Sequence, residues 1–246
     1  MRNIENYMEE YKKHDFEEIQ VSYRRKKVLE QINLYPHKSI LEIGCGLMPI
    51  FNYFDDFETM TIVDPGIEFF ENAKKLSRNK PQIKFIHGFF ENTINELIKQ
   101  NYDIIIVSGL LNELERPNIF LKALKTVCSP NTVIHINVPN AMSLHRILAK
   151  EMGLIEDVTQ KSETQIRLQQ HSTFSMDSLI ELVKKHQFKI IDHGSFFIKP
   201  FTHQQMHCML NANIIDAKVL DGLYELTKYM QDYGSEIFVN CQIHIT

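Results

Sequence analysis

Cysteine patterns, tryptophan and long hydrophobic runs are all missing from this chain. The four cysteines, Cys45, Cys128, Cys208 and Cys241, form no Cys-x-x-Cys pair, and there is no tryptophan. Such cysteines are typical of reduced thiols and not of a disulfide framework or a zinc cluster. No apolar stretch approaches the length of about 20 residues that a membrane helix needs, and segment 1–10 is too acidic for a signal peptide. We therefore expect a cytoplasmic protein without a membrane partner.

The net charge and the length of the chain bear on its partners and on its number of domains. The 246 residues carry a formal net charge of −4 with no long lysine or arginine stripe, so a nucleic-acid partner is not expected. A 43% share of hydrophobic residues is enough for one large α/β core but hardly for two. The chain is therefore predicted to be one domain with insertions.

Apolar runs alternate with helical patterns along the first half of the chain. A helix is predicted near residues 5–33, and another follows Ser175, its N-cap. Alternating strands and helices imply right-handed crossovers and a Rossmann-like, doubly wound, mostly parallel sheet, with ligands bound outside the carboxyl ends of its strands. The predicted strands lie near 39–43, 59–63, 83–86, 103–107, 132–138 and 189–192.

The most informative segment is the turn after the first strand. Glu42 lies in a buried apolar run that breaks at Gly44 and Gly46, two residues whose missing Cβ lets a ligand approach the backbone N–H groups. The third glycine of the dinucleotide fingerprint is absent, since Pro49 stands where that pattern would end. The turn therefore favours a nucleoside-like cofactor without phosphates.

An acid follows the second strand. Asp64 and Pro65 end an apolar run one helix and one strand after Gly46, which is where a carboxylate can accept both ribose hydroxyls. The same carboxylate could instead cap the next helix. It could also hold the ribose of NAD, so a nicotinamide-dependent oxidoreductase remains an alternative.

The stretch from Leu41 to Gly46 resembles the first motif of the class I S-adenosylmethionine-dependent methyltransferases. The His-x-x-Phe-Ser pattern from His171 to Ser175 is similar to a segment of small-molecule methyltransferases related to the ubiquinone-pathway O-methyltransferases. The resemblance runs from about Ser39 to Pro200, with Met48 in place of the usual third small residue. It implies S-adenosylmethionine as the cofactor and an antiparallel last strand, formed by a hairpin of 188–198 with 236–245.

The same resemblance assigns the cofactor residues. The segment after residue 86 would line the adenine, with Phe89 where an aspartate is usual and with Phe89 or Phe90 as an apolar face. The turn after the fourth strand should also face the cofactor. The predicted cofactor residues are Glu42, Gly44, Cys45, Gly46, Asp64, Pro65, Phe89, Phe90, Ser108, Gly109 and Leu110.

Acceptor residues are less sharply indicated. Leu111, Asn112 and Glu113 match a Leu-Glu-His triplet of the family, so Glu113 is either a base, a substrate contact or a solvated helix-entry residue. His171 is the first candidate for a general base, or else a helix cap or lid tie. An anionic acceptor would need no base but would need donors such as Arg146, Arg167, Lys199 or His145. The predicted substrate-binding residues are Asn112, Asn140, His145 and Arg146.

The predicted organisation is a single methyltransferase domain, 1–246. It has a helical cap at 1–37, a cofactor-binding core at 38–138, a lid at 139–175 and a helical insertion at 203–231 that covers the substrate or forms a dimer contact. His203 and His207 lack a third ligand, so no metal is predicted. The predicted function is methyl transfer to an oxygen, less readily a nitrogen, of a small polar metabolite such as a sugar or surface-polysaccharide building block. The acceptor is its expected partner, and the enzyme is a monomer or homodimer. An inactive binding module is a further alternative.

Overall fold

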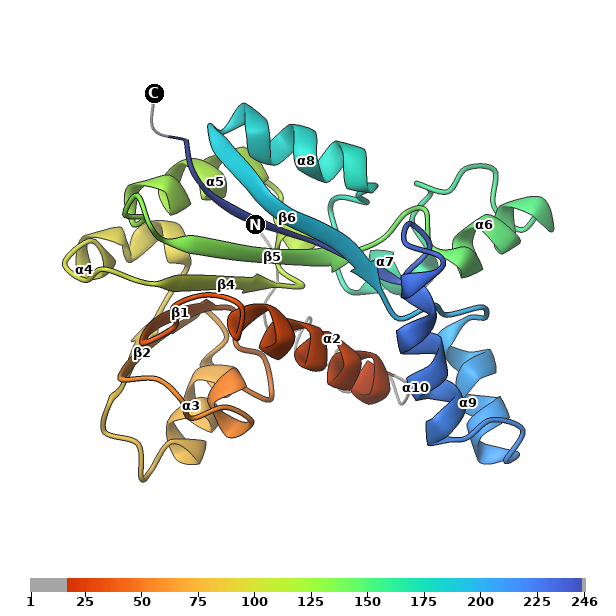
Figure 1. Ribbon diagram of the computed structural model, residues 1–246, viewed down its shortest axis with the longest axis horizontal. Coiled ribbons are helices and arrows are strands. Elements are labelled where there is room, and N and C mark those ends of the chain that lie inside the picture. Colours follow the sequence, from red (N-terminus) through yellow and green to blue (C-terminus); the bar gives the residue numbers. More distant parts are fainter. Residues whose placement is uncertain (1–16, 245–246) are drawn as a thin grey trace.

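The computed structural model describes residues 17–244, apart from the side chain of Thr164. Within these residues the chain forms one seven-stranded sheet with helices on both faces, as Figure 1 shows. The strands are β1 (Ser39–Ile43), β2 (Thr59–Asp64), β3 (Ile83–His87), β4 (Ile104–Ser108), β5 (Val133–Pro139), β6 (Phe188–Phe196) and β7 (Glu236–Ile243). The α-helices are α2 (Glu17–Ile32), α3 (Ile67–Leu76), α4 (Ile94–Leu97), α5 (Pro117–Thr126), α6 (Leu144–Glu151), α7 (Glu163–Arg167), α8 (Met176–Lys185), α9 (His203–Asn211) and α10 (Ala217–Glu225).

The strand order is β3-β2-β1-β4-β5-β7-β6. The first five strands of this order are mutually parallel, and β7 pairs antiparallel with both β5 and β6. This confirms the Rossmann-like doubly wound sheet with an antiparallel last strand. The chain reverses its direction of winding between β1 and β4, so a ligand crevice is expected at their carboxyl ends.

Two cores cover the two faces of the sheet, because successive strand side chains point to opposite sides. In β1, Ile40 packs with α2 and α3, whereas Leu41 packs with α5 and α8. In β4, Ile104 and Ile105 divide in the same way. Each buried aliphatic side chain contributes about 1.5–3 kcal/mol to folding. The central strands are thereby held rigidly enough to position the turns at their ends.

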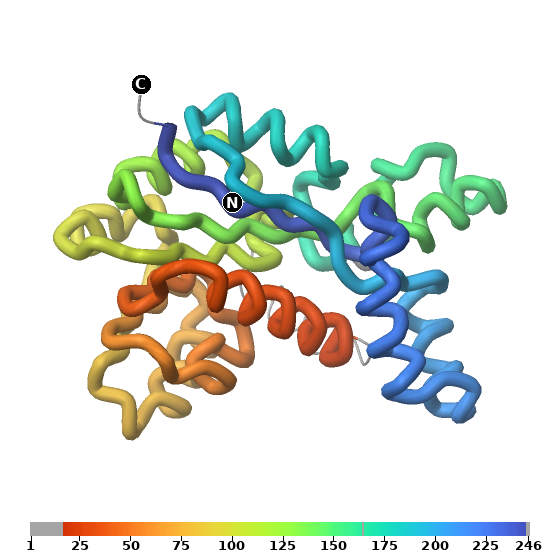
Figure 2. The backbone as a smooth tube through the Cα atoms, viewed as in Figure 1, coloured from red at the N-terminus to blue at the C-terminus, as the bar shows by residue number. Residues whose placement is uncertain are grey.

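A third cluster fastens the late helices to the first one. Tyr23 of α2 stacks on Phe197 with ring centroids 4.5 Å apart and on Tyr224 of α10 at 5.4 Å. Met206 of α9 and Phe238 of β7 are buried in the same cluster. Figure 2 shows the red α2 tube running toward the blue α9–α10 pair. The segment 203–231 is thus helical, as predicted, and packs against α2.

Some predicted boundaries differ from the structure. The predicted N-terminal helix begins at residue 5, but residues 1–16 of the predicted cap lie outside the described part. The segment 139–175, which the sequence predicts as a lid, contains the short helices α6 and α7. Ser175 caps α8 as predicted, accepting a hydrogen bond from the backbone N–H of Ser178. The subdivision of the domain stays a prediction.

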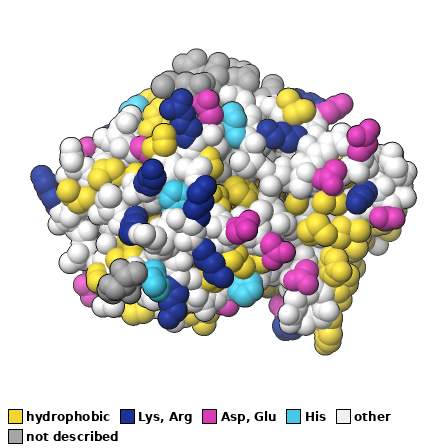
Figure 3. Space-filling view, turned by 90° about the horizontal axis from the view of Figure 1, so that it is seen from above, with side chains coloured by type: hydrophobic (Ala, Val, Ile, Leu, Met, Phe, Trp, Pro, Cys, Tyr) yellow, Lys and Arg dark blue, Asp and Glu magenta, His cyan; other side chains and the backbone are white. Residues whose placement is uncertain are grey.

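Charged side chains of both signs share the surface. On the face in Figure 3, lysine and arginine side chains are more frequent toward the α5 side, and acidic side chains toward the α6 side. This mixture accords with the small net charge. Among the described residues, no helix has the length and apolar character needed to cross a membrane.

Candidate active site

A cavity of about 820 Å³ opens at the carboxyl ends of β1, β2, β4 and β5. It is floored by the turns that follow these strands, and α2, the lid segment and the connection from β6 to α9 line its sides. Its lining includes Gly44, Gly46 and Asp64 together with His145 and Lys199. The volume lies within the range of small-molecule sites. The cavity is therefore the candidate active site.

The turn after β1 is shaped for close approach to a ligand. Gly44 and Gly46 have φ values of +79° and +57°, which side-chain-bearing residues rarely adopt. A Cβ added at Gly46 would meet nothing within 4 Å, so the space beside its backbone belongs to the cavity. The side chain of Met48, the residue in place of the usual small one, also lines the cavity. The turn leaves room for a nucleoside.

Asp64 anchors this turn to the end of β2. Its Oδ2 accepts hydrogen bonds from the backbone N–H groups of Cys45 at 2.9 Å and Gly46 at 3.4 Å, and its Oδ1 accepts from Gly66 at 2.8 Å. Burial raises the pKa of this carboxyl, opposed by these N–H donors. Asp64 thus shapes the turn and starts α3, and its oxygens retain lone pairs toward the cavity.

Glu42 braces the other side of the turn. Both of its carboxyl oxygens lie 3.2 Å from the backbone nitrogen of Ile50, which donates to them. Burial raises the pKa of Glu42 to about 8 despite this hydrogen bond. Beside it, burial raises the pKa of the Cys45 thiol, which packs on Asp64. Both residues line the cavity, and their contact with the cofactor stays a prediction.

The turn after β4 forms the next part of the floor. Ser108, Gly109 and Leu110 all line the cavity, and Gly109 has a φ of +65°. The guanidinium of Arg24 lies over Gly109, 3.7 Å from where a Cβ would be. The turns after β1, β2 and β4 therefore line one cavity. Pro65 lines its edge.

The adenine face predicted at Phe90 is wrong. Phe90 is 3% exposed and packs against Phe120 of α5, with ring centroids 5.1 Å apart, so its ring is in the core. Phe89 is exposed and does not line the cavity. A short 3₁₀ turn begins at Phe90 and directs its ring inward. Phe69 of α3 supplies an apolar side chain at the cavity edge instead.

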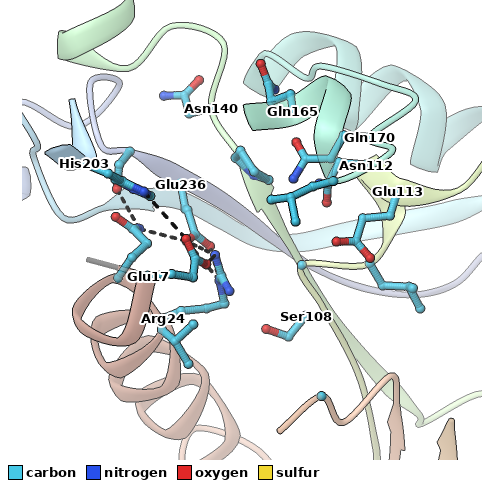
Figure 4. Close-up of a pocket in the computed structure, with 18 of the residues that line it drawn as sticks. Glu17, Arg24, Ser108, Asn112, Glu113, Asn140, Gln165, Gln170, His203 and Glu236 are labelled. Carbon is cyan, nitrogen blue, oxygen red and sulfur yellow. Dashed lines mark hydrogen bonds and ion pairs between the residues drawn. The ribbon is translucent and has the colours of Figure 1, made fainter. Parts of the chain in front are cut away.

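A buried charge network closes one side of the cavity. Glu236, the first residue of β7, accepts from Arg24 at 2.9 Å, from Gln20 at 2.8 Å and from Asn137 at 2.9 Å. Figure 4 shows dashed lines joining Glu17, Arg24, Glu236 and His203 on this side. These partners lie far apart in sequence, so no motif reveals the network. It holds α2 against the sheet beside the cofactor turns.

The opposite side and the roof carry buried polar atoms that make no hydrogen bond in the described part of the chain. They are Asn112 Oδ1, His145 Nδ1, Gln170 Oε1 and Thr173 Oγ1, and all four side chains line the cavity. Figure 4 shows Asn112, Gln170 and Glu113 facing the cavity across from the charge network. Leaving such groups unpaired costs about 1–3 kcal/mol each. This arrangement fits a polar ligand that would satisfy them.

His145 and Lys199 add ionisable groups to the cavity lining. Burial and the nearby charges of Lys199, His203 and Arg146 lower the pKa of His145 well below its usual value, so its ring is neutral at pH 7. Burial lowers the pKa of Lys199 to about 8. Glu113 is buried and also faces the cavity.

Three predicted acceptor residues have other surroundings. His171 is exposed and outside the cavity lining, and its backbone N–H donates to the Asn112 carbonyl, so it is not placed as a base. The Asn140 amide donates to the carbonyls of Asp232 and Gly234. Arg146 donates to the carbonyl of Val158 at 2.7 Å and to the side chain of Gln165, so it joins parts of the segment 139–175 to one another. Asn140 and Arg146 line the cavity but serve chiefly to hold its walls.

No cluster of three or more His, Cys, Asp or Glu that could hold a metal ion occurs within residues 17–244. His207 receives a hydrogen-bonding contact from Asn211 within α9, at 2.9 Å.

The fold and the glycine-and-acid turns define a class of protein, the S-adenosylmethionine-dependent methyltransferases. A family model described as a methyltransferase domain matches residues 11–193, which is most of the chain. The chain belongs to this family, and S-adenosylmethionine is its cofactor. This assignment replaces the nicotinamide alternative.

Individual relatives are distant. The chain is 27% identical over 130 residues to a malonyl-[acyl-carrier protein] O-methyltransferase of Halalkalibacterium halodurans, and the match covers 49% of this chain and 48% of that relative. The chain thus spans about half the length of this curated relative.

Solved structures agree on the fold. The plantazolicin methyltransferase BamL, bound to a substrate analogue and SAH, has a TM-score of 0.60 at 18% identity, covering 94% of this chain and 88% of that one. The N-methyltransferase NodS of Bradyrhizobium japonicum WM9 with S-adenosylhomocysteine has a TM-score of 0.55 at 10% identity, covering 94% and 89%. Both were crystallised with the demethylated cofactor.

Proposed function

We propose that this methyltransferase moves the methyl group of S-adenosylmethionine to an oxygen of a small polar acceptor bound beneath the lid. One observation carries the proposal. A single cavity joins the cofactor turns at Gly44, Gly46 and Asp64 to the unpaired polar atoms at Asn112 and His145. Two ligands that must react need such a shared, enclosed space.

The geometry of the turns after β1, β2 and β4 supports the proposed cofactor position. The backbone at Gly44 and Gly46 leaves the space for the adenosyl group, and the Asp64 carboxylate accepts the ribose hydroxyls with its remaining lone pairs. Ser108, Gly109 and Leu110 then face the methionine part. When bound, S-adenosylmethionine supplies a sulfonium-activated methyl group, and the protein supplies its position.

The acceptor end supplies proton acceptance and orientation. Neutral His145 takes the proton of an acceptor hydroxyl as the new carbon–oxygen bond makes that hydroxyl strongly acidic. Asn112 and Gln170 orient the acceptor through their unpaired oxygens, and Glu113 contacts it from the turn after β4. A sulfonium methyl needs no further activation, so alignment of the two reacting atoms provides most of the rate.

Oxygen is favoured over nitrogen as the acceptor atom. The curated relative with 27% identity is an O-methyltransferase. The unpaired oxygens of Asn112 and Gln170 suit the hydroxyl groups of a polyol, such as a sugar building block of surface polysaccharides. The proposed setting is cytoplasmic, with the acceptor as partner, no nucleic acid, and a monomer or homodimer.

The test has a binding arm and a turnover arm. Calorimetry should show S-adenosylhomocysteine binding that Asp64→Ala abolishes, while Asp56→Ala, which changes an exposed surface ion pair, leaves it intact. S-adenosylhomocysteine release should then be measured over a panel of sugars, sugar phosphates, uronic acids, acyl thioesters and amines. Turnover of amines alone would overturn the oxygen assignment. Tight binding without turnover of any acceptor would favour an inactive binding module.

A further inference from the structure

The chain makes an unusual turn as it leaves the edge strand β6. Phe197 is fully buried yet has a φ of +58°, a conformation that costs a non-glycine residue free energy. The turn is fixed from both sides, because the N–H of Ser235 donates to the Phe197 carbonyl and the N–H of Ile198 donates to the Leu223 carbonyl. Stacking of Tyr23 on the Phe197 ring further stabilises the turn. The strained turn directs the next residues back toward the cavity.

Lys199 follows this turn and lines the cavity. It is only 4% exposed, and within residues 17–244 its amine is affected by the charges of neighbouring groups but has no hydrogen-bond partner. A lysine is almost never fully buried unless it is paired. Burial without a partner is therefore the feature that needs a ligand to explain it.

Neighbouring carboxylates do not supply that partner. Glu236 is already saturated by Arg24, Gln20 and Asn137. Glu17 lies 3.4 Å from Arg24 and 3.8 Å from His203. The negative charges of Glu17 and Glu236 raise the pKa of Lys199, but neither carboxylate forms a hydrogen bond with its amine.

Lys199 lies close to the charge network, because the charges of Glu17, Glu236 and Arg24 act on its amine. It follows β6, which is separated from β1 in the sheet by β4, β5 and β7. Lys199 is near enough to His145 that its charge acts on that ring. The unpaired Thr173 hydroxyl lines the same cavity.

We propose that Lys199 anchors an oxyanion of the methyl acceptor, a carboxylate or a phosphoryl group, in a subsite separate from the cofactor turns. The inference rests on the proposed function, since it names the acceptor class of that site. The ammonium donates to one oxyanion oxygen, and the acceptor hydroxyl that receives the methyl is thereby placed near His145. The acceptor is thus an acidic metabolite, such as a uronate or a sugar phosphate.

Ligand-observed NMR on the enzyme saturated with S-adenosylhomocysteine tests this subsite. The probes are acetate, inorganic phosphate and neutral acetamide, at constant ionic strength. We expect acetate or phosphate, but not acetamide, to bind the wild type, and Lys199→Met to weaken that binding about tenfold or more. Lys199→Arg should retain it in part. Lys228→Met is the matched control, because that lysine is exposed and pairs with Glu225.

The outcomes separate the subsite from the proposed function. If the wild type fails to bind S-adenosylhomocysteine, the proposed function itself fails. If that cofactor product binds, but neither anion binds or Lys199→Met binds them as well as the wild type, the subsite alone is overturned. Loss of S-adenosylhomocysteine affinity in folded Lys199→Met would assign the lysine to the cofactor carboxylate, which also overturns it. Whether acetate or phosphate is preferred identifies the oxyanion.

Discussion

The guanidinium of Arg24 lies 2.7 Å from the Glu236 carboxylate and ties the first described helix to the first residue of the last strand. The two residues are 212 positions apart, and the Glu236 side chain is 2% exposed. Their contact also places Arg24 over the backbone of Gly109 in the turn after β4. One buried ion pair therefore joins α2 to β7 next to the turn after β4.

Breaking this pair should destabilise the protein strongly. Arg24→Met leaves the Glu236 carboxylate buried without its cation, which costs about 3 kcal/mol of unfolding free energy. Urea denaturation measures this loss. The control is Arg167→Met, whose exposed pair with Glu163 contributes about 0.5 kcal/mol or less. Adding Glu236→Gln to Arg24→Met should recover part of the stability, and a loss that the second change deepens would contradict the account.

The glycine turn gives a prediction on affinity. Gly46→Ala forces a Cβ onto a backbone with φ +57° and places it in cavity space, so it should cost about 1 kcal/mol of stability and weaken S-adenosylhomocysteine binding about tenfold. Calorimetry and thermal unfolding measure the two effects. Gly222→Ala is the matched control: it lies inside α10 with open space around it, and should stabilise by about 0.5–1 kcal/mol without changing affinity. Unchanged affinity in Gly46→Ala would remove this turn from the site.

The raised pKa of Glu42 implies that the stability of the protein depends on pH. Its pKa is raised from 4.5 to about 8 in the folded protein, so between those values the native state binds the proton that the unfolded state has lost. The unfolding free energy should therefore fall as the pH rises through this window. Glu42→Gln should flatten that slope in urea denaturation at pH 5 to 8, whereas Glu96→Gln, on an exposed position, should not. Identical slopes in the wild type and Glu42→Gln would refute the raised pKa.

The sequence indicates the sheet and the cofactor turns because both depend on local pattern. The run 39–43 and the glycines after it form β1 and its turn as predicted, since burial and positive φ are properties of those residues themselves. The directions of loop side chains, by contrast, depend on partners that are distant in the sequence. Phe90 turns into the core because Phe120 packs there, and Arg24 meets Glu236 through folding alone. No local pattern in the sequence marks such pairings, because the partners are distant along the chain.

The positions of His171 and His145 also differ from what local sequence patterns suggest, and they lead to a prediction on which histidine accepts the proton. His171 matches a family pattern but is exposed, while His145 carries no comparable pattern and points an unpaired ring nitrogen into buried space beside the cavity. With an acceptor that supports turnover, His145→Ala should lower kcat/KM about 100-fold, because it removes the proton acceptor. His171→Ala should stay within about twofold, as expected of a surface change. Initial rates of S-adenosylhomocysteine release, with cofactor affinity measured in parallel, show which of the two histidines is the proton acceptor. The reverse pattern would return the base to His171 and require the lid to carry that residue inward when the acceptor binds.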